Sequence, residues 1–242
     1  MDKMQKSAFQ TSSKVLLKEL KGLITNPLEG FHMIKYDEKF LYEWEIGVFG
    51  PPKTLYEGGY FPVKIRFPKD YPYKPPIVRF TTPMFHPNVY ADGAVCISIL
   101  HSPVNDPMSG ELASERWSPS QSVRSVLLSI VSLLNEPNTS SPANVDASVL
   151  YGRYKRCTEK KKAAHKYAVI IKQQVEESRK LAIEKGIEPP VTIDDYVSQR
   201  RSSSSSSWNQ SMQSSVDEDD EPFYNDDDSE ADISIPLDTS MN

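Results

Sequence analysis

Hydrophobic residues recur with a helical period near the start of the chain, between residues 7 and 25. The apolar side of this segment carries Leu16, Leu20, Leu23 and Ile24. The opposite side carries Lys14, Lys18 and Lys21. Apolar residues at such intervals gather on one face of an α-helix. The pattern predicts an amphipathic helix with one packing face and one basic face.

From residue 31 to residue 80 the period changes to two, which is typical of half-buried strands. The alternating apolar positions are Tyr42, Trp44, Ile46, Val48, Phe61, Val63, Ile65 and Phe67. Gly and Pro at residues 50–52 and 57–59 supply the backbone angles that tight turns need. We expect an antiparallel meander, followed by a proline-rich corner at residues 71–76.

Helical periodicity returns in the second half of the chain. Residues 118–121, Ser-Pro-Ser-Gln, have the spacing of a capping box with proline at the first helical position. This helix is expected to end near residue 135 and to cover one face of the sheet with its wide apolar stripe. Two further helices are predicted at residues 146–155 and 158–185, and order is expected to fade after residues 189–190.

The net charge of -5 is unevenly distributed. Residues 202–242 hold eleven of the 33 acidic residues and no Lys or Arg, so the first 201 residues carry a balance of +6. The tail also lacks the apolar residues that offset chain entropy, so we predict that residues 200–242 are disordered. An acidic tail suits docking on a basic protein surface rather than on nucleic acid, and a solubilising role fits the charge equally well.

Composition excludes several classes of protein. The longest apolar run, near residues 126–134, is too short to span a membrane, and two cysteines cannot form a disulfide framework. The four histidines are scattered, without metal-ligand spacing. We therefore expect an intracellular protein of the cytoplasm and nucleus, with no bound metal and no membrane or nucleic-acid partner.

The most specific chemical signal lies at residues 86–96, His-Pro-Asn-Val-Tyr-Ala-Asp-Gly-Ala-Val-Cys. Its turn-forming residues deliver Cys96 into an irregular loop, with Asn88 eight positions upstream. A thiolate forms acyl thioesters, and a carboxamide can donate a hydrogen bond to the oxyanion that forms when a thioester is attacked. The two residues together predict a covalent acyl carrier.

Several short motifs follow one another along the chain. In order they are Phe49-Gly50-Pro51, Tyr56-Glu57-Gly58-Gly59, the proline-rich corner, His86-Pro87-Asn88, Cys96 and Trp117-Ser118-Pro119. Together they resemble the motifs of ubiquitin-conjugating enzymes. The resemblance covers residues 8–190 and implies an α+β catalytic domain: an N-terminal helix, a four-stranded antiparallel meander, an active-site loop and C-terminal helices. It implies no bound cofactor, because the upstream activating enzyme uses the ATP.

The resemblance also implies roles around the cysteine. Cys96 would accept ubiquitin from the activating enzyme and pass it to a lysine amine, and Asn88 would stabilise the oxyanion or hold the loop. His86 and Pro87 would shape the active-site loop. No basic residue adjoins Cys96 in the sequence, so we expect catalysis to depend on positioning and oxyanion stabilisation rather than on an imidazole-paired thiol.

Two departures from the common family pattern concern deprotonation of the attacking amine. Ser98 stands where many members have an acidic residue, and Ser140 and Ser141 stand where many have Asp. An insertion at residues 101–115 follows the cysteine, and its acidic residues are Asp106, Glu111 and Glu115. We expect this acidic loop to orient an incoming ubiquitin lysine or to lower its pKa on attack; a loop without function is the alternative.

The insertion, Ser98 and the acidic tail together resemble the R-type enzymes of cell-division control, which work with cullin-RING ligases and build degradation-signalling polyubiquitin chains. The G-type shares the insertion but lacks the tail. By resemblance, the activating enzyme binds Lys14, Lys18 and Lys21, and the RING domain binds Tyr73, Pro119 and Ser120. The tail residues expected to dock on the cullin are Asp217, Glu218, Asp219, Asp220, Glu221, Phe223, Tyr224, Asp226, Asp227 and Asp228.

Three other functions compete with this interpretation. A variant that binds ubiquitin without carrying it is disfavoured by the presence of Cys96. A carrier of another ubiquitin-like modifier is disfavoured by the insertion and the tail. A cysteine hydrolase needs a histidine base and an orienting carboxylate, and the sequence has no nucleophile elbow.

Overall fold

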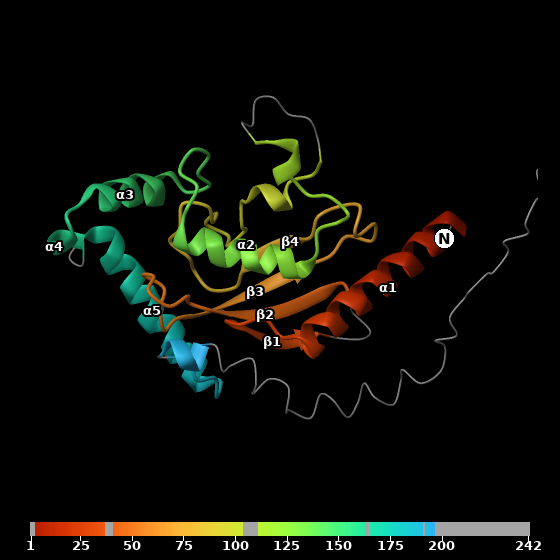
Figure 1. Ribbon diagram of the computed structural model, residues 1–242, viewed down its shortest axis with the longest axis horizontal. Coiled ribbons are helices and arrows are strands. Elements are labelled where there is room, and N and C mark those ends of the chain that lie inside the picture. The colour runs from red at the N-terminus through yellow and green to blue at the C-terminus, as the bar shows by residue number, and fades with distance from the viewer. Residues whose placement is uncertain (1–2, 37–40, 104–110, 163–164, 191, 197–242) are drawn as a thin grey trace, which may run out of the picture. The chain divides into compact units, whose positions relative to one another are not determined.

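Four strands form the antiparallel meander that the two-residue period predicts. They are β1 (Phe31–Tyr36), β2 (Glu43–Phe49), β3 (Tyr60–Arg66) and β4 (Ile77–Phe80), and they lie side by side in that order (Figure 1). Alternate apolar residues pair across the ladder, Trp44 with Ile65 and Ile46 with Val63, and all four are buried. The sheet therefore contributes one continuous apolar face to the core.

The computed structural model describes residues 3–36, 41–103, 111–162, 165–190 and 192–196. The whole tail expected to be disordered, residues 200–242, lies outside this part of the chain. None of the helices within the described ranges combines the length and apolar character needed to cross a membrane.

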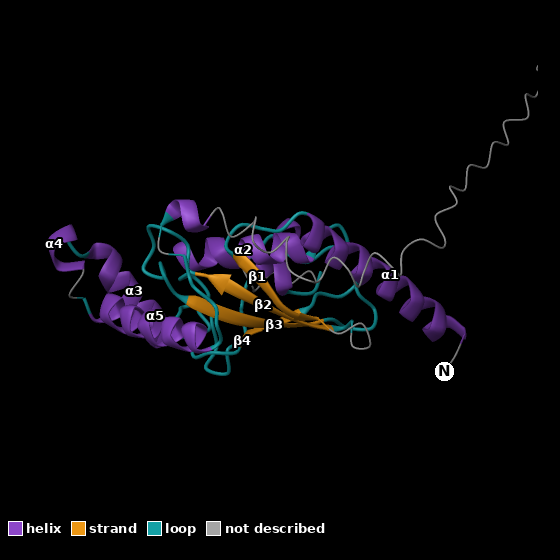
Figure 2. Ribbon diagram, turned by 90° about the horizontal axis from the view of Figure 1, so that it is seen from below, coloured by secondary structure: helices purple, strands orange, loops and turns teal. Residues whose placement is uncertain are grey.

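Two helices pack near one another beside the sheet. α1 (Lys3–Thr25) buries Leu16 and Leu20, and α2 (Val123–Asn135) lies along one face of the strands, as Figure 2 shows. Glu19 of α1 joins them, because its carboxylate accepts hydrogen bonds from the Val123 N–H (2.6 Å) and the Tyr71 hydroxyl (2.5 Å). The first helix is thereby fixed to the start of the second and to the proline-rich corner.

The beginning of α2 differs from the sequence prediction. Residues 118–121 form a turn closed by the Gln121 N–H and the Ser118 carbonyl (2.9 Å), and the helix begins at Val123, five residues after the predicted cap Ser118. Ser122 is the actual N-cap, and Ser122 and Ser125 form a reciprocal capping box. The serine-rich segment offers two such caps, and the contact between Glu19 and Val123 lies at the one that the protein uses.

The C-terminal helices are α3 (Val145–Arg156), α4 (Glu159–Lys162) and α5 (Lys166–Glu184). Figures 1 and 2 show this group at the opposite end of the sheet from α1. A single helix over residues 158–185 was the wrong prediction, because His165 caps α5 separately with its Nδ1 accepting from the Tyr167 N–H (3.2 Å). α5 packs against β3, where the Tyr60 N–H donates to the Ser178 hydroxyl (3.1 Å).

Order also extends further than predicted. Residues 193–196 form a helical turn, capped where Thr192 and Asp195 exchange hydrogen bonds. Tyr196 packs with Ile187 against Phe49 and Tyr60 at the sheet. The aromatic ring therefore holds the chain in place beyond the two prolines at which order was expected to fade.

Candidate active site

The segment after β4 folds into a hairpin that places Cys96. The Cys96 N–H donates to the Asn88 carbonyl (2.9 Å), and the Val95 N–H donates to the Val78 carbonyl in β4 (3.0 Å). Backbone hydrogen bonds thus fix the cysteine to its own loop and, through its neighbour, to the sheet. The Cys96 side chain remains partly exposed.

A glycine makes this hairpin possible. Gly93 has a φ of 83°, a left-handed conformation that other residues rarely adopt. A Cβ at this position would lie 2.2 Å from the carbonyl oxygen of Phe80, which belongs to the backbone of β4. The close approach lets the Phe80 N–H donate to the Gly93 carbonyl (2.9 Å), so the tip of the hairpin is bound directly to the strand.

The carboxamide of Asn88 is buried and joins two loops. Its Nδ2 donates to the Asn138 carbonyl and its Oδ1 accepts from the Asn138 N–H, both at 2.8 Å. This reciprocal pair holds the segment after α2 against the cysteine hairpin. Nδ2 carries two hydrogens, so one further hydrogen bond to an oxyanion is compatible with this structural role. The structure thus shows the loop-holding role, and Nδ2 keeps the second hydrogen that the oxyanion role requires.

His86 anchors the same loop from below the surface. Its Nε2 donates to the Leu133 carbonyl near the end of α2 (3.0 Å), and its Nδ1 accepts from the Asn88 N–H (3.0 Å). The side chain is fully buried, and burial lowers the pKa of His86 to about 4, against the opposing effect of the Leu133 carbonyl. The adjacent Pro87 carbonyl accepts from the Asn144 N–H (2.9 Å). Both residues therefore maintain the loop.

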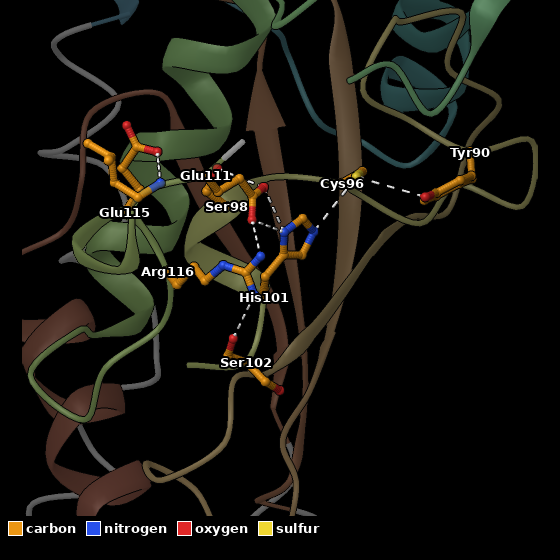
Figure 3. Close-up of polar contacts among 9 residues, drawn as sticks. Tyr90, Cys96, Ser98, His101, Ser102, Glu111, Glu115 and Arg116 are labelled. Carbon is orange, nitrogen blue, oxygen red and sulfur yellow. Dashed lines mark hydrogen bonds and ion pairs between the residues drawn. The ribbon is translucent and has the colours of Figure 1, made fainter. Parts of the chain in front are cut away.

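The expectation that no imidazole accompanies the thiol was wrong. The Nε2 atom of His101 lies 3.7 Å from the Cys96 sulfur (Figure 3). The residues between them include a short 3-10 helix, η2 (Ser98–Leu100), which shortens the path along the chain. The hydroxyl of Tyr90 also approaches the sulfur, at 3.9 Å. Both contacts were missed, although a histidine five positions after the cysteine was a usable signal.

A carboxylate from the insertion completes this arrangement. Both oxygens of Glu111 lie close to the His101 Nδ1, at 2.8 and 2.9 Å. The Ser98 hydroxyl donates to the same carboxylate (3.0 Å), and Arg116 forms an ion pair with it (3.1 Å). Partial burial opposes ionisation, but the hydrogen bonds from His101 and Ser98 and the charge of Arg116 hold the pKa of Glu111 below its usual range.

This network explains the serine that departs from the family pattern. Ser98 supplies a hydrogen-bond donor, and the carboxylate that it binds belongs to Glu111, thirteen residues further along the chain. The acidic group of this site, which contacts the cysteine's neighbour His101, therefore comes from the insertion. Arg116, buried at the base, also donates to the Ser102 carbonyl (3.3 Å) and so holds both ends of the insertion together.

The other predicted loop residues lie elsewhere. Glu115 points away from the thiol in Figure 3, and its carboxylate accepts from the Leu112 N–H (3.1 Å) to cap the short helix η3 (Ala113–Glu115). Ser141 is exposed in the segment after α2. Asp106 and the predicted cullin-docking residues at 217–228 lie outside the described residues. Of the two acidic residues of the insertion that the structure describes, Glu111 is the one that contacts the histidine.

The predicted docking residues are exposed. Lys14, Lys18 and Lys21 all lie on the solvent side of α1. Tyr73 is 67% exposed, and Pro119 and Ser120 are also exposed. The Trp117 indole N–H donates to the Pro72 carbonyl (2.7 Å), so the loop before α2 and the proline-rich corner are joined next to these residues.

Comparison with known proteins identifies the class. The family described as "Ubiquitin-conjugating enzyme" matches residues 15–167. "Ubiquitin-conjugating enzyme E2 7" of Arabidopsis thaliana is 53% identical over 153 residues, covering 63% of this chain and 92% of that protein. "Ubiquitin-conjugating enzyme E2 G2" of Homo sapiens is 53% identical over 141 residues, covering 58% of this chain and 86% of that protein.

The chain belongs to the ubiquitin-conjugating enzyme family. Its members are transferases that work through a thioester intermediate, and family membership implies ubiquitin, an activating enzyme and a ligase as partners. The fold agrees with this assignment, from the N-terminal helix through the four-stranded antiparallel sheet to the C-terminal helices.

Proposed function

We propose that Cys96 carries ubiquitin as a thioester and passes it to lysine amines. The observation that supports this most strongly is the placement of a partly exposed sulfur at the end of a hairpin, with its backbone bound to Asn88 and its sulfur beside His101. The thiolate attacks the thioester presented by the activating enzyme, and its sulfur later leaves when an amine attacks. Asn88 is the proposed oxyanion donor, through the second hydrogen of its Nδ2.

The proposed acceptors are lysines of target proteins and of ubiquitin itself, so that polyubiquitin chains signalling degradation are built. The insertion supports this choice because it brings a negative carboxylate, Glu111, close to the thiol, where a positively charged amine must approach. Asp106 and Glu115 add negative charge to the same insertion.

Within the family we propose the R-type, acting with a cullin-RING ligase. The matches to the relatives named above cover 58–63% of this chain, so the choice depends on the acidic tail that follows the catalytic domain. Its eleven acidic residues and absence of Lys and Arg suit a basic groove on the cullin. The G-type is the second candidate, favoured by the identity of 53% with "Ubiquitin-conjugating enzyme E2 G2".

Two docking surfaces complete the proposal. The activating enzyme would bind the lysine row of α1, and the RING domain would bind at Tyr73, Pro119 and Ser120. Glu19 connects α1 to α2 and to the corner that carries Tyr73, which supports overlapping rather than independent binding. The two partners would therefore compete.

Thioester formation tests the carrier role. The full-length chain is mixed with ubiquitin, activating enzyme and ATP, and the products are separated with and without thiol reductant. We expect a reductant-sensitive adduct that survives C157S and that disappears, or becomes a reductant-resistant ester, with C96S. A reductant-sensitive adduct that survives C96S and is lost with C157S would place the carrier at the wrong cysteine.

The tail proposal has a separate test. A chain that ends at residue 201 should load normally but respond less to a cullin-RING complex, and the difference should shrink as salt is raised, because charged contacts of this kind are screened. Replacing the eleven acidic tail residues by amides, with the length kept, separates charge from tether length. Equal stimulation of the truncated and full-length chains at low salt would refute the docking role and favour the G-type.

A further inference from the structure

The ring of His101 connects the cysteine to the insertion. One nitrogen, Nε2, lies 3.7 Å from the Cys96 sulfur, and the other, Nδ1, lies 2.8 and 2.9 Å from the two oxygens of Glu111 (Figure 3). A thiol, an imidazole and a carboxylate in this order form the arrangement in which a histidine accepts and returns protons. The sequence-based mechanism assigned no group to deprotonate the attacking amine.

We propose that His101, oriented by Glu111, accepts the proton of the attacking lysine ammonium and returns it to the departing Cys96 sulfur. The proposal rests on the carrier role of Cys96 and adds to it the group that removes the proton. His101 would be a catalytic residue, because it contacts the reacting sulfur, and Glu111 and Ser98 would be positioning residues that act through it.

The hydrogen bonds determine which nitrogen is free to accept the proton. An ionised carboxylate only accepts hydrogen bonds, so the Nδ1 that faces Glu111 carries the hydrogen in the neutral ring. The lone pair is then on Nε2, which faces the sulfur. Three donors converge on Glu111, from His101, Ser98 and Arg116, and they keep the carboxylate ionised and in place.

The proton balance can be written for a loaded Cys96. Nε2 takes one proton from the ammonium, and the neutral amine attacks the carbonyl carbon, forming the C–N bond and an oxyanion. The oxyanion collapses, the C–S bond breaks, and the electron pair leaves on the sulfur. Nε2 returns its proton to this thiolate, and the second proton of the attached nitrogen passes to water. The products are an amide, a thiol and one released proton.

The groups that face the imidazole favour this transfer. Glu111 stabilises the imidazolium that forms halfway through the reaction, as a carboxylate does in an acid–base triad. Arg116 pairs with the Glu111 carboxylate (3.1 Å), and the Tyr90 hydroxyl contacts the sulfur (3.9 Å). The ring is partly exposed, with 36% of its side-chain surface open to solvent, the side from which an amine must approach.

The test compares two acceptors on the loaded full-length chain. Free lysine is a cation at neutral pH and needs a base, whereas hydroxylamine is already neutral and needs none. We expect H101Q to load ubiquitin normally. Its discharge to lysine should be about 100-fold slower than that of the wild type, which is the lower end of general base effects. Its discharge to hydroxylamine should stay within about twofold of the wild-type rate. E111Q should show the same selectivity with a smaller loss, about tenfold. H32Q, which removes a histidine of β1, is the matched control.

The pH dependence provides a second readout. The H101Q rate with lysine should rise about tenfold per pH unit between about pH 7 and pH 9, because only the free amine reacts and the lysine pKa is about 10.4. The wild-type rate should rise less steeply, so the two profiles converge. A loss that is equal for both acceptors, or constant across pH, would contradict proton transfer and leave a structural role. Slower loading of H101Q would instead show that the imidazole activates the thiol, which also overturns the proposal.

Failure of the carrier role gives a different result. A wild-type chain that takes no ubiquitin overturns both proposals together. A wild-type chain that loads on Cys96, with H101Q discharging to lysine at the wild-type rate, overturns only the role of His101. Discharge to water without added amine identifies the remaining alternative, because a hydrolase would lose this reaction in H101Q as well.

Discussion

The chain on the two sides of Cys96 is held in two different ways. Upstream, His86 and Asn88 are buried, and each binds backbone atoms on the segment around the end of α2. Downstream, His101 and Glu111 are partly exposed, and they bind each other and further side chains. Two histidines near one cysteine thus have opposite environments. The His86 ring is buried with both nitrogens bound to backbone atoms, and the His101 ring is partly exposed and faces the sulfur.

The two sides of the site have different tasks: one positions the sulfur, and the other supplies ionisable groups. Backbone partners have fixed positions, so the upstream contacts determine where the sulfur lies. Ionisable partners can exchange protons, so the downstream contacts can take part in the chemistry. Mutations of His86 should therefore change mainly stability, and mutations on the downstream side should change mainly transfer.

The largest effect expected is the loss of the buried imidazole in H86A. Removing the ring leaves the Leu133 carbonyl and the Asn88 N–H unpaired inside the protein and creates a cavity. We expect the unfolding free energy to fall by about 4 kcal/mol and the melting temperature by about 12 °C. Denaturant and thermal unfolding measure this, with H101A as the partly exposed counterpart, expected to lose no more than about 1 kcal/mol.

The same histidine should make stability depend on pH. Burial lowers the pKa of His86 to about 4, against about 6.5 for an unfolded chain. Between these values the unfolded chain binds a proton that the folded chain excludes, so stability is lost as the pH falls below about 6.5, by about 3 kcal/mol in total. Burial also lowers the pKa of His32, so His32 makes stability depend on pH in the same direction. The contribution of His86 alone is therefore the difference between the pH dependence of the wild type and that of H86Q.

That difference should be found in unfolding measured between about pH 7 and pH 5. The wild-type curve should fall more steeply than the H86Q curve over this range. Parallel curves would mean that His86 becomes protonated in the folded protein without cost, which contradicts a pKa lowered by burial.

A mutation at the tip of the hairpin, G93A, should reduce stability by an intermediate amount. G93A would need a left-handed φ and would push a Cβ against the Phe80 carbonyl oxygen. We expect a loss of about 2 kcal/mol, and thioester formation should slow as the cysteine shifts. G186A is the matched control, because Gly186 has a similar φ of 73° but open space around it. The control should lose only the conformational part, about 1 kcal/mol, and load normally; equal losses would show that the close approach to β4 is unimportant.

The smallest effect concerns the serine at the acidic position of the family. S98A removes one hydrogen bond of 3.0 Å to Glu111 and leaves the His101 and Arg116 contacts in place. A hydrogen bond to a charged group contributes about 1.5 kcal/mol, so discharge to lysine should slow by about tenfold or less. Unfolding should change little. A loss as large as that of H101Q would mean that Ser98 itself acts on the substrate.

The sequence predicted the order and nature of most elements because their periods are local. Alternation in β2 and β3 and the apolar stripe of α2 depend only on neighbouring residues, and these elements are confirmed. The start of α2 was misplaced because Ser118 and Ser122 offer similar caps, and a contact from distant Glu19 lies at the second. Tyr196 extends the ordered chain through packing against Phe49, which no local pattern reveals.

The part of the site that a local motif forms was predictable from the sequence. The contacts between residues distant in the sequence were less so. The hairpin of Asn88 and Cys96 follows from its turn residues. Glu111 lies ten positions after His101, and sequence separation alone does not say that the two ends of the insertion come together, as they do where Arg116 binds both. His101 itself was within reach, since a single turn of η2 separates it from the cysteine.

The division between the two sides of Cys96 is tested most directly by the acceptor preference of the two histidine variants. Loaded H86Q, H101Q and wild-type chains are each discharged to free lysine and to hydroxylamine at a temperature where all three remain folded. The rate of discharge to lysine divided by the rate of discharge to hydroxylamine should be unchanged in H86Q. In H101Q this ratio should fall about 100-fold. A ratio that changes equally in both variants, or in neither, would contradict the assignment of proton transfer to the downstream side alone.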